Sequence, residues 1–133
     1  MQILGHEFVH HSELFMEDFD SDYDQGIWFE EGMCEYISRK YFLTAEEFQA
    51  EAEINTLLAA QFRNIYGNHS LEEFGQETYR NDYASIFYEY WRSFLAVQQI
   101  IDAHHGDISA VFRSYRKWYD EKSPLTLEQW FGL

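Results

Sequence analysis

Apolar residues recur along this chain at three- and four-residue spacings, the pattern of amphipathic helices, and strand-like alternation is hard to find. One proline and seven glycines interrupt the 133 residues, so few positions force a break. The pattern predicts helices over residues 1–17, 28–42, 45–66, 82–104 and 108–119, with short helices after residues 70 and 126. We therefore predict an all-α fold of about six to seven helices.

Capping motifs define several ends of these helices. Residues 44–47 (Thr-Ala-Glu-Glu) and 70–73 (Ser-Leu-Glu-Glu) have the sequence of capping boxes, and Asp107 can cap the helix that follows it. Gly67 and Gly106 are expected to end the helices before them.

Composition and charge narrow the class of protein. The length fits one domain, residues 1–133, and the 46% of hydrophobic residues suffice for a core. A net charge of −15 disfavours binding to nucleic acid or anionic membranes and leaves peptide or protein partners. Cys34 is the one cysteine, which excludes an internal disulfide and a cysteine metal cluster. We expect no membrane span and see no signal-peptide pattern at the start.

The first predicted helix carries the candidate chemistry in the run His6-Glu7-Phe8-Val9-His10. Residues four apart advance by about 400° on a helix, so the two imidazoles project from one face. That spacing lets both rings reach one Zn²⁺ at about 2.0–2.1 Å, with Glu7 beside them to act as a base. The alternative is a helix with two ordinary histidines.

A second motif, Trp-Phe-Glu-Glu-Gly-Met-Cys-Glu-Tyr at residues 28–36, follows the first after a short loop. Together the two motifs resemble the gluzincin zinc metallopeptidases, in the group related to aminopeptidases and peptidase MA. The resemblance implies that Glu31 is the third zinc ligand, and the Glu-Gly pairing favours it over Glu30. Two histidines and one carboxylate leave a coordination position for water, as a catalytic zinc requires.

The same resemblance implies two further site residues. Glu35, one turn after Glu31, would accept the far ring N–H of a zinc-bound histidine. Tyr90, in the run Tyr-Trp-Arg-Ser-Phe at 90–94, would donate a hydrogen bond to the oxyanion of the reaction. Glu35 could instead be a solvated helix charge, and most aromatic residues must lie in the core. The other candidate oxyanion donors are Tyr83, Tyr88, His69, His104 and His105.

The position of the motif suggests a missing part. Family members place a β-sheet before the active-site helix, whereas here the motif begins at residue 6. We therefore expect a zincin-like helical domain without the usual N-terminal β-sheet, as in an N-terminally truncated catalytic domain. The surface that a sheet normally covers could then pair with a second copy of the chain.

The acidic loop before the second motif admits another interpretation. Asp20, Asp22, Asp24 and Glu31 fall at positions 1, 3, 5 and 12 of an EF-hand-like calcium loop, but Gln25 stands where the sharp turn calls for glycine. A calcium site here and the zinc site would both need Glu31 as a ligand. A solvated acidic rim, able to attract basic substrates, also accounts for the loop.

These observations lead to one principal hypothesis and two alternatives. The principal hypothesis is zinc-dependent peptide-bond hydrolysis, with one Zn²⁺ per chain held by His6, His10 and Glu31 and a metal-activated water deprotonated by Glu7. The first alternative is a catalytically inactive zincin-like domain that binds a protein partner. The second alternative is a calcium-binding helix–loop–helix module.

Overall fold

The computed structural model describes residues 2–16, 26–76 and 82–133, and this part of the chain is helical with no strand. Its elements are α1 (Gln2–His10), α2 (Ile27–Phe42), α3 (Ala45–Tyr66), the 3-10 helix η1 (Leu71–Glu73), α4 (Tyr83–Ala103), α5 (Ile108–Asp120) and α6 (Leu127–Phe131). The prediction of an all-α fold is confirmed.

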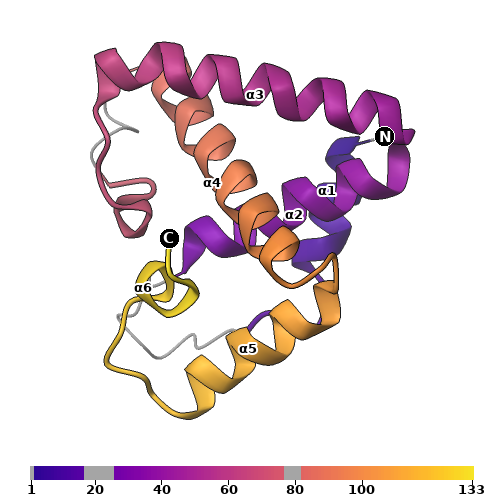
Figure 1. The fold of residues 1–133 in the computed structure, drawn as a ribbon, viewed down its shortest axis with the longest axis vertical. Helices are drawn as coiled ribbons and strands as arrows, with labels where there is room; N and C mark the ends of the chain where they lie inside the picture. Colours follow the sequence, from indigo (N-terminus) through magenta and orange to yellow (C-terminus); the bar gives the residue numbers. More distant parts are fainter. Residues whose placement is uncertain (1, 17–25, 77–81) are drawn as a thin grey trace.

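Helices α2 and α4 form the centre of the molecule. Each packs against the other, while α1 covers α2 and the long α3 packs against α4 (Figure 1). The core comes largely from these two central helices, which bury the side chains of Trp28, Phe29, Met33, Phe94, Val97 and Ile101. The first two motifs therefore lie on adjacent, packed helices.

The caps explain where most helices begin. The Thr44 side chain accepts a hydrogen bond from the Glu47 amide at 3.2 Å, and the Glu47 carboxylate accepts one from the Thr44 amide at 2.8 Å. Asp107 accepts from the Ala110 amide, and α3 ends at Gly67, which has a positive φ. The capping box at 44–47 and the cap at Asp107 are confirmed.

Two sequence predictions about the helices are wrong. The first helix ends at His10 and does not continue to residue 17, because the hydroxyl of Ser12 donates to the Val9 carbonyl at 2.6 Å and turns the chain. At 70–73 the expected capping box gives only a 3-10 turn. There Ser70 accepts from the Glu72 amide and pairs with Glu128 of α6, so Glu73 closes no box.

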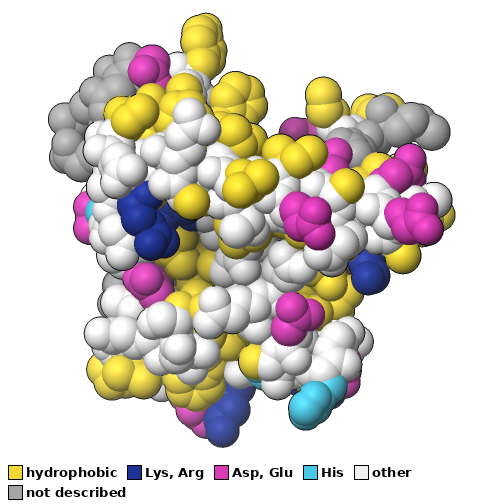
Figure 2. Space-filling view, turned by 45° about the horizontal axis from the view of Figure 1, so that its top comes forward, with side chains coloured by type: hydrophobic (Ala, Val, Ile, Leu, Met, Phe, Trp, Pro, Cys, Tyr) yellow, Lys and Arg dark blue, Asp and Glu magenta, His cyan; other side chains and the backbone are white. Residues whose placement is uncertain are grey.

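The surface combines charge with exposed apolar side chains. Figure 2 shows hydrophobic side chains gathered in the upper part of one face, with acidic side chains among them. On α1, Ile3, Leu4 and Phe8 are 78%, 70% and 80% exposed, and Leu57 of α3 is 70% exposed. Within the described residues, no helix combines the length and apolarity that crossing a membrane requires.

Candidate metal centre

His6 and His10 meet on the side of α1 that faces α2. They lie one turn apart, and their Nε2 atoms approach to 2.9 Å, with the rings edge to face at a centroid distance of 4.7 Å. Two imidazole nitrogens this close can share one proton or one metal ion. The four-residue spacing thus produces the convergence expected of it.

Glu31 completes a triangle with the two histidines. Its Oε2 atom lies 3.2 Å from Nε2 of His6 and 3.4 Å from Nε2 of His10. This oxygen is buried and has no hydrogen-bond partner in the described part of the chain. The group of His6, His10 and Glu31 thus offers three ligand atoms within a few ångströms of one another.

The triangle suits a zinc ion. Ligand atoms bound tetrahedrally at about 2.0–2.1 Å lie about 3.3 Å apart, close to the three separations observed here. Two imidazole nitrogens and one carboxylate oxygen are a donor set that zinc prefers, and the buried carboxylate oxygen favours a positive charge beside it, from a metal ion or from a proton on His6. The residues present therefore fit the metal.

Each histidine also has its second ring nitrogen next to a carboxylate. Glu35 Oε1 lies 2.9 Å from Nδ1 of His6, and Glu30 Oε1 lies 2.9 Å from Nδ1 of His10. Such contacts fix the tautomer and direct Nε2 toward the metal position. The family resemblance implies this role for Glu35, whereas Glu30 was expected only as a rival ligand. The sequence signal for Glu30 is only that it adjoins Glu31, and its contact with His10 depends on how α1 lies across α2.

The carboxylates control the charge of this cluster. Burial alone would lower the pKa of His6, but the Glu31 and Glu35 carboxylates outweigh it and raise the pKa to about 9. Burial alone would raise the pKa of Glu35, but His6 and Arg39 outweigh it and lower the pKa. The cluster thus attracts cations, and a proton competes with a metal ion for His6.

Tyr90 of α4 lies next to His6. The two ring centroids are 6.4 Å apart, and Phe74 packs edge to face against Tyr90. The rival Tyr88 is fully buried and donates its hydroxyl to the Gly67 carbonyl at 2.7 Å, whereas Tyr83 is 83% exposed at the start of α4. Tyr90 is therefore the best placed of these three tyrosines.

Glu7 follows His6 on α1, and its side chain is exposed to solvent. Glu7 is not part of the group of ligand atoms that converge.

The remaining histidine candidates lie outside the convergent group. His69 pairs through Nε2 with the fully buried Glu89 at 2.7 Å, and Arg92 donates to the His69 carbonyl. His104 contacts the Ile100 carbonyl through Nδ1 at 2.8 Å, and His105 is exposed at the end of α4. None of them belongs to the convergent group.

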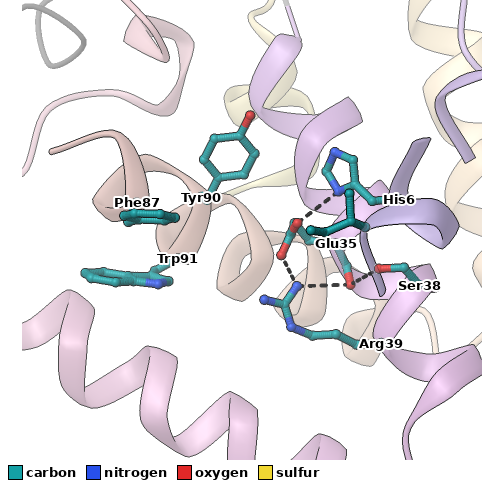
Figure 3. Close-up of a pocket in the computed structure, with 8 residues that line it drawn as sticks. His6, Glu35, Ser38, Arg39, Phe87, Tyr90 and Trp91 are labelled. Carbon is teal, nitrogen blue, oxygen red and sulfur yellow. Dashed lines mark hydrogen bonds and ion pairs between the residues drawn. The ribbon is translucent and has the colours of Figure 1, made fainter. Parts of the chain in front are cut away.

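A pocket of about 320 Å³ adjoins His6 between α1, α2 and α4 (Figure 3). Phe87 and Trp91, whose rings stack at 6.3 Å, form one wall, and Arg39 extends toward the space from the opposite side. The other lining residues are Ile3, His6, Glu35, Ser38 and Tyr90. An apolar pocket beside a metal centre can hold a side chain of a bound molecule.

The calcium interpretation falls mostly outside the described residues. Asp20, Asp22 and Asp24 are not among them, nor is Gln25. Glu31, which both metals would need, directs Oε2 toward the two histidines.

Comparison with known proteins identifies a family. A family model described as collagenase, peptidase M9, matches residues 2–127. Comparisons with curated proteins and with solved structures give no significant match. The matched range covers α1, α2 and α4, the helices that carry the centre.

Proposed function

The chain belongs to the collagenase family peptidase M9, a family of zinc metallopeptidases, and from this premise we propose that it hydrolyses peptide bonds at a zinc ion held by His6, His10 and Glu31. The observation that carries the proposal is the convergence of two histidine nitrogens and an otherwise unpaired carboxylate oxygen. We further propose that the arrangement is of the gluzincin type, with one zinc ion per chain.

Each residue of the centre has a role in this proposal. A zinc ion, when bound, supplies a Lewis acid for the scissile carbonyl and lowers the pKa of its water ligand. Glu7 accepts the proton of the attacking water and passes it to the leaving amine. The hydroxyl of Tyr90 donates a hydrogen bond to the developing oxyanion. Glu30 and Glu35 hold the histidine rings in orientation.

The pocket beside His6 suggests how a peptide is held. We propose that its Phe87 and Trp91 wall receives an apolar side chain of the substrate next to the scissile bond. Since the family is described as collagenase, unfolded collagen chains are the first substrates to test.

Metal analysis and cleavage assays test the proposal together. The wild-type chain should retain one zinc per chain after dialysis, and Glu31→Gln should lose most of it. Glu7→Gln should keep the zinc and lose at least about 100-fold in cleavage of gelatin or a quenched peptide. Glu53→Gln makes the same chemical change on the exposed face of α3 and should alter neither the zinc content nor the cleavage rate. Full zinc retention by Glu31→Gln, or normal cleavage by Glu7→Gln, would contradict the assignment.

A second candidate function has one observation in its favour. The exposed apolar side chains of Ile3, Leu4 and Phe8 on α1 could bind a protein partner or a second copy of the chain. Zinc-loaded wild type that cleaves no peptide and shows a concentration-dependent mass in ultracentrifugation would favour this function. A monomer that cleaves gelatin would exclude it as the principal one.

A further inference from the structure

Arg39, near the end of α2, joins carboxylates from two helices. Its Nη1 pairs with Glu35, one turn earlier on α2, and also donates to the Glu35 carbonyl at 3.2 Å. Its Nε donates to Oε2 of Glu51 on α3 at 2.7 Å. The guanidinium thus lies between a carboxylate that contacts the metal centre and one that does not.

The Arg39 side chain is held on several sides. Only 15% of it is exposed, and its guanidinium carbon lies 4.9 Å from the centre of the Phe94 ring, which is fully buried. A planar guanidinium fixed by stacking and by two carboxylates has little freedom to rotate. Arg39 can therefore act as a rigid support, unlike an arginine on the surface.

Glu35 passes this constraint to the metal centre. One of its oxygens, Oε2, pairs with Arg39, and the other, Oε1, lies 2.9 Å from Nδ1 of His6. Because each oxygen has a different partner, rotating the carboxylate would break both contacts. Figure 3 shows His6, Glu35 and Arg39 linked in this order.

We propose that Arg39 and Glu51 are positioning residues of the zinc centre: Glu51 holds Arg39, Arg39 holds Glu35, and Glu35 keeps Nε2 of His6 directed at His10 and Glu31. The inference rests on the metal site of the proposed function, and it goes beyond that site. Helix α3, which provides no ligand, becomes part of the machinery that determines zinc affinity. Neither Arg39 nor Glu51 touches a metal ligand directly.

For the loss of Arg39, simple electrostatics and the positioning role predict opposite changes in zinc affinity. Arg39 carries a positive charge near a cation site, so removing that charge alone should strengthen zinc binding. Positioning predicts weaker binding when Arg39 is lost. Replacement by lysine keeps the charge and loses the planar fork, so it should weaken binding only if positioning matters.

Zinc affinity in the metal-free chain, measured by competition with a chromophoric chelator, tests the proposal. Arg39→Gln and Arg39→Lys should each weaken zinc binding by about tenfold, and Glu51→Gln by a smaller factor. Lys40→Gln, one residue along α2, and Glu53→Gln, two residues along α3, make matched charge changes and should leave the affinity unchanged. The double variant Arg39→Gln/Glu51→Gln should bind no more weakly than Arg39→Gln, because Glu51 acts through Arg39.

Spectroscopy separates positioning from a loss of fold. With Co²⁺ in place of zinc, the visible absorption should change in position or intensity for Arg39→Lys and remain that of wild type for Lys40→Gln. Circular dichroism and urea unfolding of the metal-free variants show whether the helices persist. Glu51→Gln, at a side chain that is 36% exposed, keeps the test open if Arg39 variants fold poorly.

Different outcomes overturn different statements. Unchanged or tighter zinc binding by Arg39→Gln, unchanged binding by Arg39→Lys, or a double variant whose loss equals the product of the single losses would overturn the positioning role. A wild-type chain that binds neither zinc nor cobalt would overturn the metal site of the proposed function, and the positioning role with it. Weaker binding in both Arg39 variants with an altered Co²⁺ spectrum supports the inference.

Discussion

Glu30 and Glu31 are neighbours in sequence and serve different atoms of the same histidine. Glu30 reaches Nδ1 of His10 at 2.9 Å, and Glu31 lies 3.4 Å from its Nε2. Adjacent residues on a helix point about 100° apart, so the two carboxylates approach the ring from different sides. In the proposed zinc centre, Glu30 orients the ring and Glu31 is the third ligand. Glu35, one turn further, does for His6 what Glu30 does for His10.

A single capping carboxylate, Asp107, should give the fold part of its acid sensitivity. The hydrogen bond from the Ala110 amide, with help from Arg113, holds the pKa of Asp107 below its usual range. A lowered folded-state pKa stabilises the fold above the unfolded value of about 4, and this contribution disappears as the pH falls through the folded-state pKa. Asp107→Asn keeps a neutral cap. It should therefore be less stable than wild type at neutral pH, with a difference that shrinks as the pH falls below about 4 and through the folded-state pKa, as urea unfolding at several pH values would measure.

Asp120, in the last turn of the same helix, provides the control. A negative charge at a helix C-terminus is unfavourable, so Asp120→Asn should not reduce stability at neutral pH. Equal acid sensitivity in Asp107→Asn and wild type would contradict the role given to the cap.

For single residues, the sequence predicted which side chains converge, but it could not predict their contacts with residues on other helices. His6, His10 and Glu31 follow from helical geometry and motif resemblance, and they converge in the structure. The contact of Glu30 with His10 depends on how α1 lies across α2, which periodicity does not encode. Tyr88 could be set aside only once its hydroxyl was seen to bind the Gly67 carbonyl, a contact between residues far apart in sequence.

Among the elements, α2 approaches the backbone of α4 closely at Gly32, the residue after Glu31. A Cβ at this position would lie 2.5 Å from the Ser93 carbonyl oxygen and 2.7 Å from Val97 Cγ2. Gly32 therefore lets the helix that carries Glu31 lie directly on α4. This gives a physical reason for the glycine in the Glu-Gly pair.

Gly32→Ala should both destabilise the fold and weaken metal binding. Overpacking costs about 1–3 kcal/mol, and a clash with backbone belongs at the upper end of that range, above the gain of about 1 kcal/mol from better helix propensity. Moving α2 away from α4 also displaces Glu31, the residue before Gly32. Urea unfolding and zinc titration of the variant would measure the two effects.

Gly5→Ala on α1 is the matched comparison. There an added Cβ would meet the Phe42 ring, which is 38% exposed and can move outward. We expect a smaller loss of stability than for Gly32→Ala. Equal stability of the Gly32→Ala variant and wild type would contradict the proposed role of the close approach.

The sequence predicted the start of a helix correctly where the capping side chain bonds to the first turn of its own helix. Thr44, Asp107 and Thr126 begin helices at the predicted places. The capping-box prediction failed where a distant residue binds the capping side chain. Ser70 donates its hydroxyl to Glu128, 58 residues away, and a 3-10 turn follows it. The early end of α1 at His10 came from the backbone contact of the Ser12 hydroxyl, which competes with the helix.

For the whole molecule, the proposed zinc centre would connect two helices. Two proposed ligands lie on α1 and one on α2, and α1 packs mainly against α2 while exposing Ile3, Leu4 and Phe8. A helix with so much apolar surface in water gains less from packing than a central helix does. Zinc should therefore matter most to α1.

Because the chain has a net charge of −15, a test of zinc binding must separate the effect of charge screening on stability from the effect of binding at the site. Self-repulsion of a highly charged chain destabilises the compact state, so any cation that screens the charge will stabilise the fold somewhat. Mg²⁺ at equal ionic strength provides that screening and has little preference for imidazole nitrogen. The difference between zinc and Mg²⁺ isolates the contribution of the site.

Zinc should accordingly raise the free energy of unfolding far more than Mg²⁺ does. A ligand that binds only the folded state at about 1,000 times its dissociation constant adds about 4 kcal/mol, and a chelator should remove this gain. Hydrogen exchange should slow most in α1 and in the first turns of α2, and least in α5, which carries no ligand. Glu31→Gln should lose most of the zinc-specific gain and keep the Mg²⁺ effect. Equal stabilisation by both ions, or protection spread evenly over α1 and α5, would mean that the cations act through charge alone and that no metal joins the two helices.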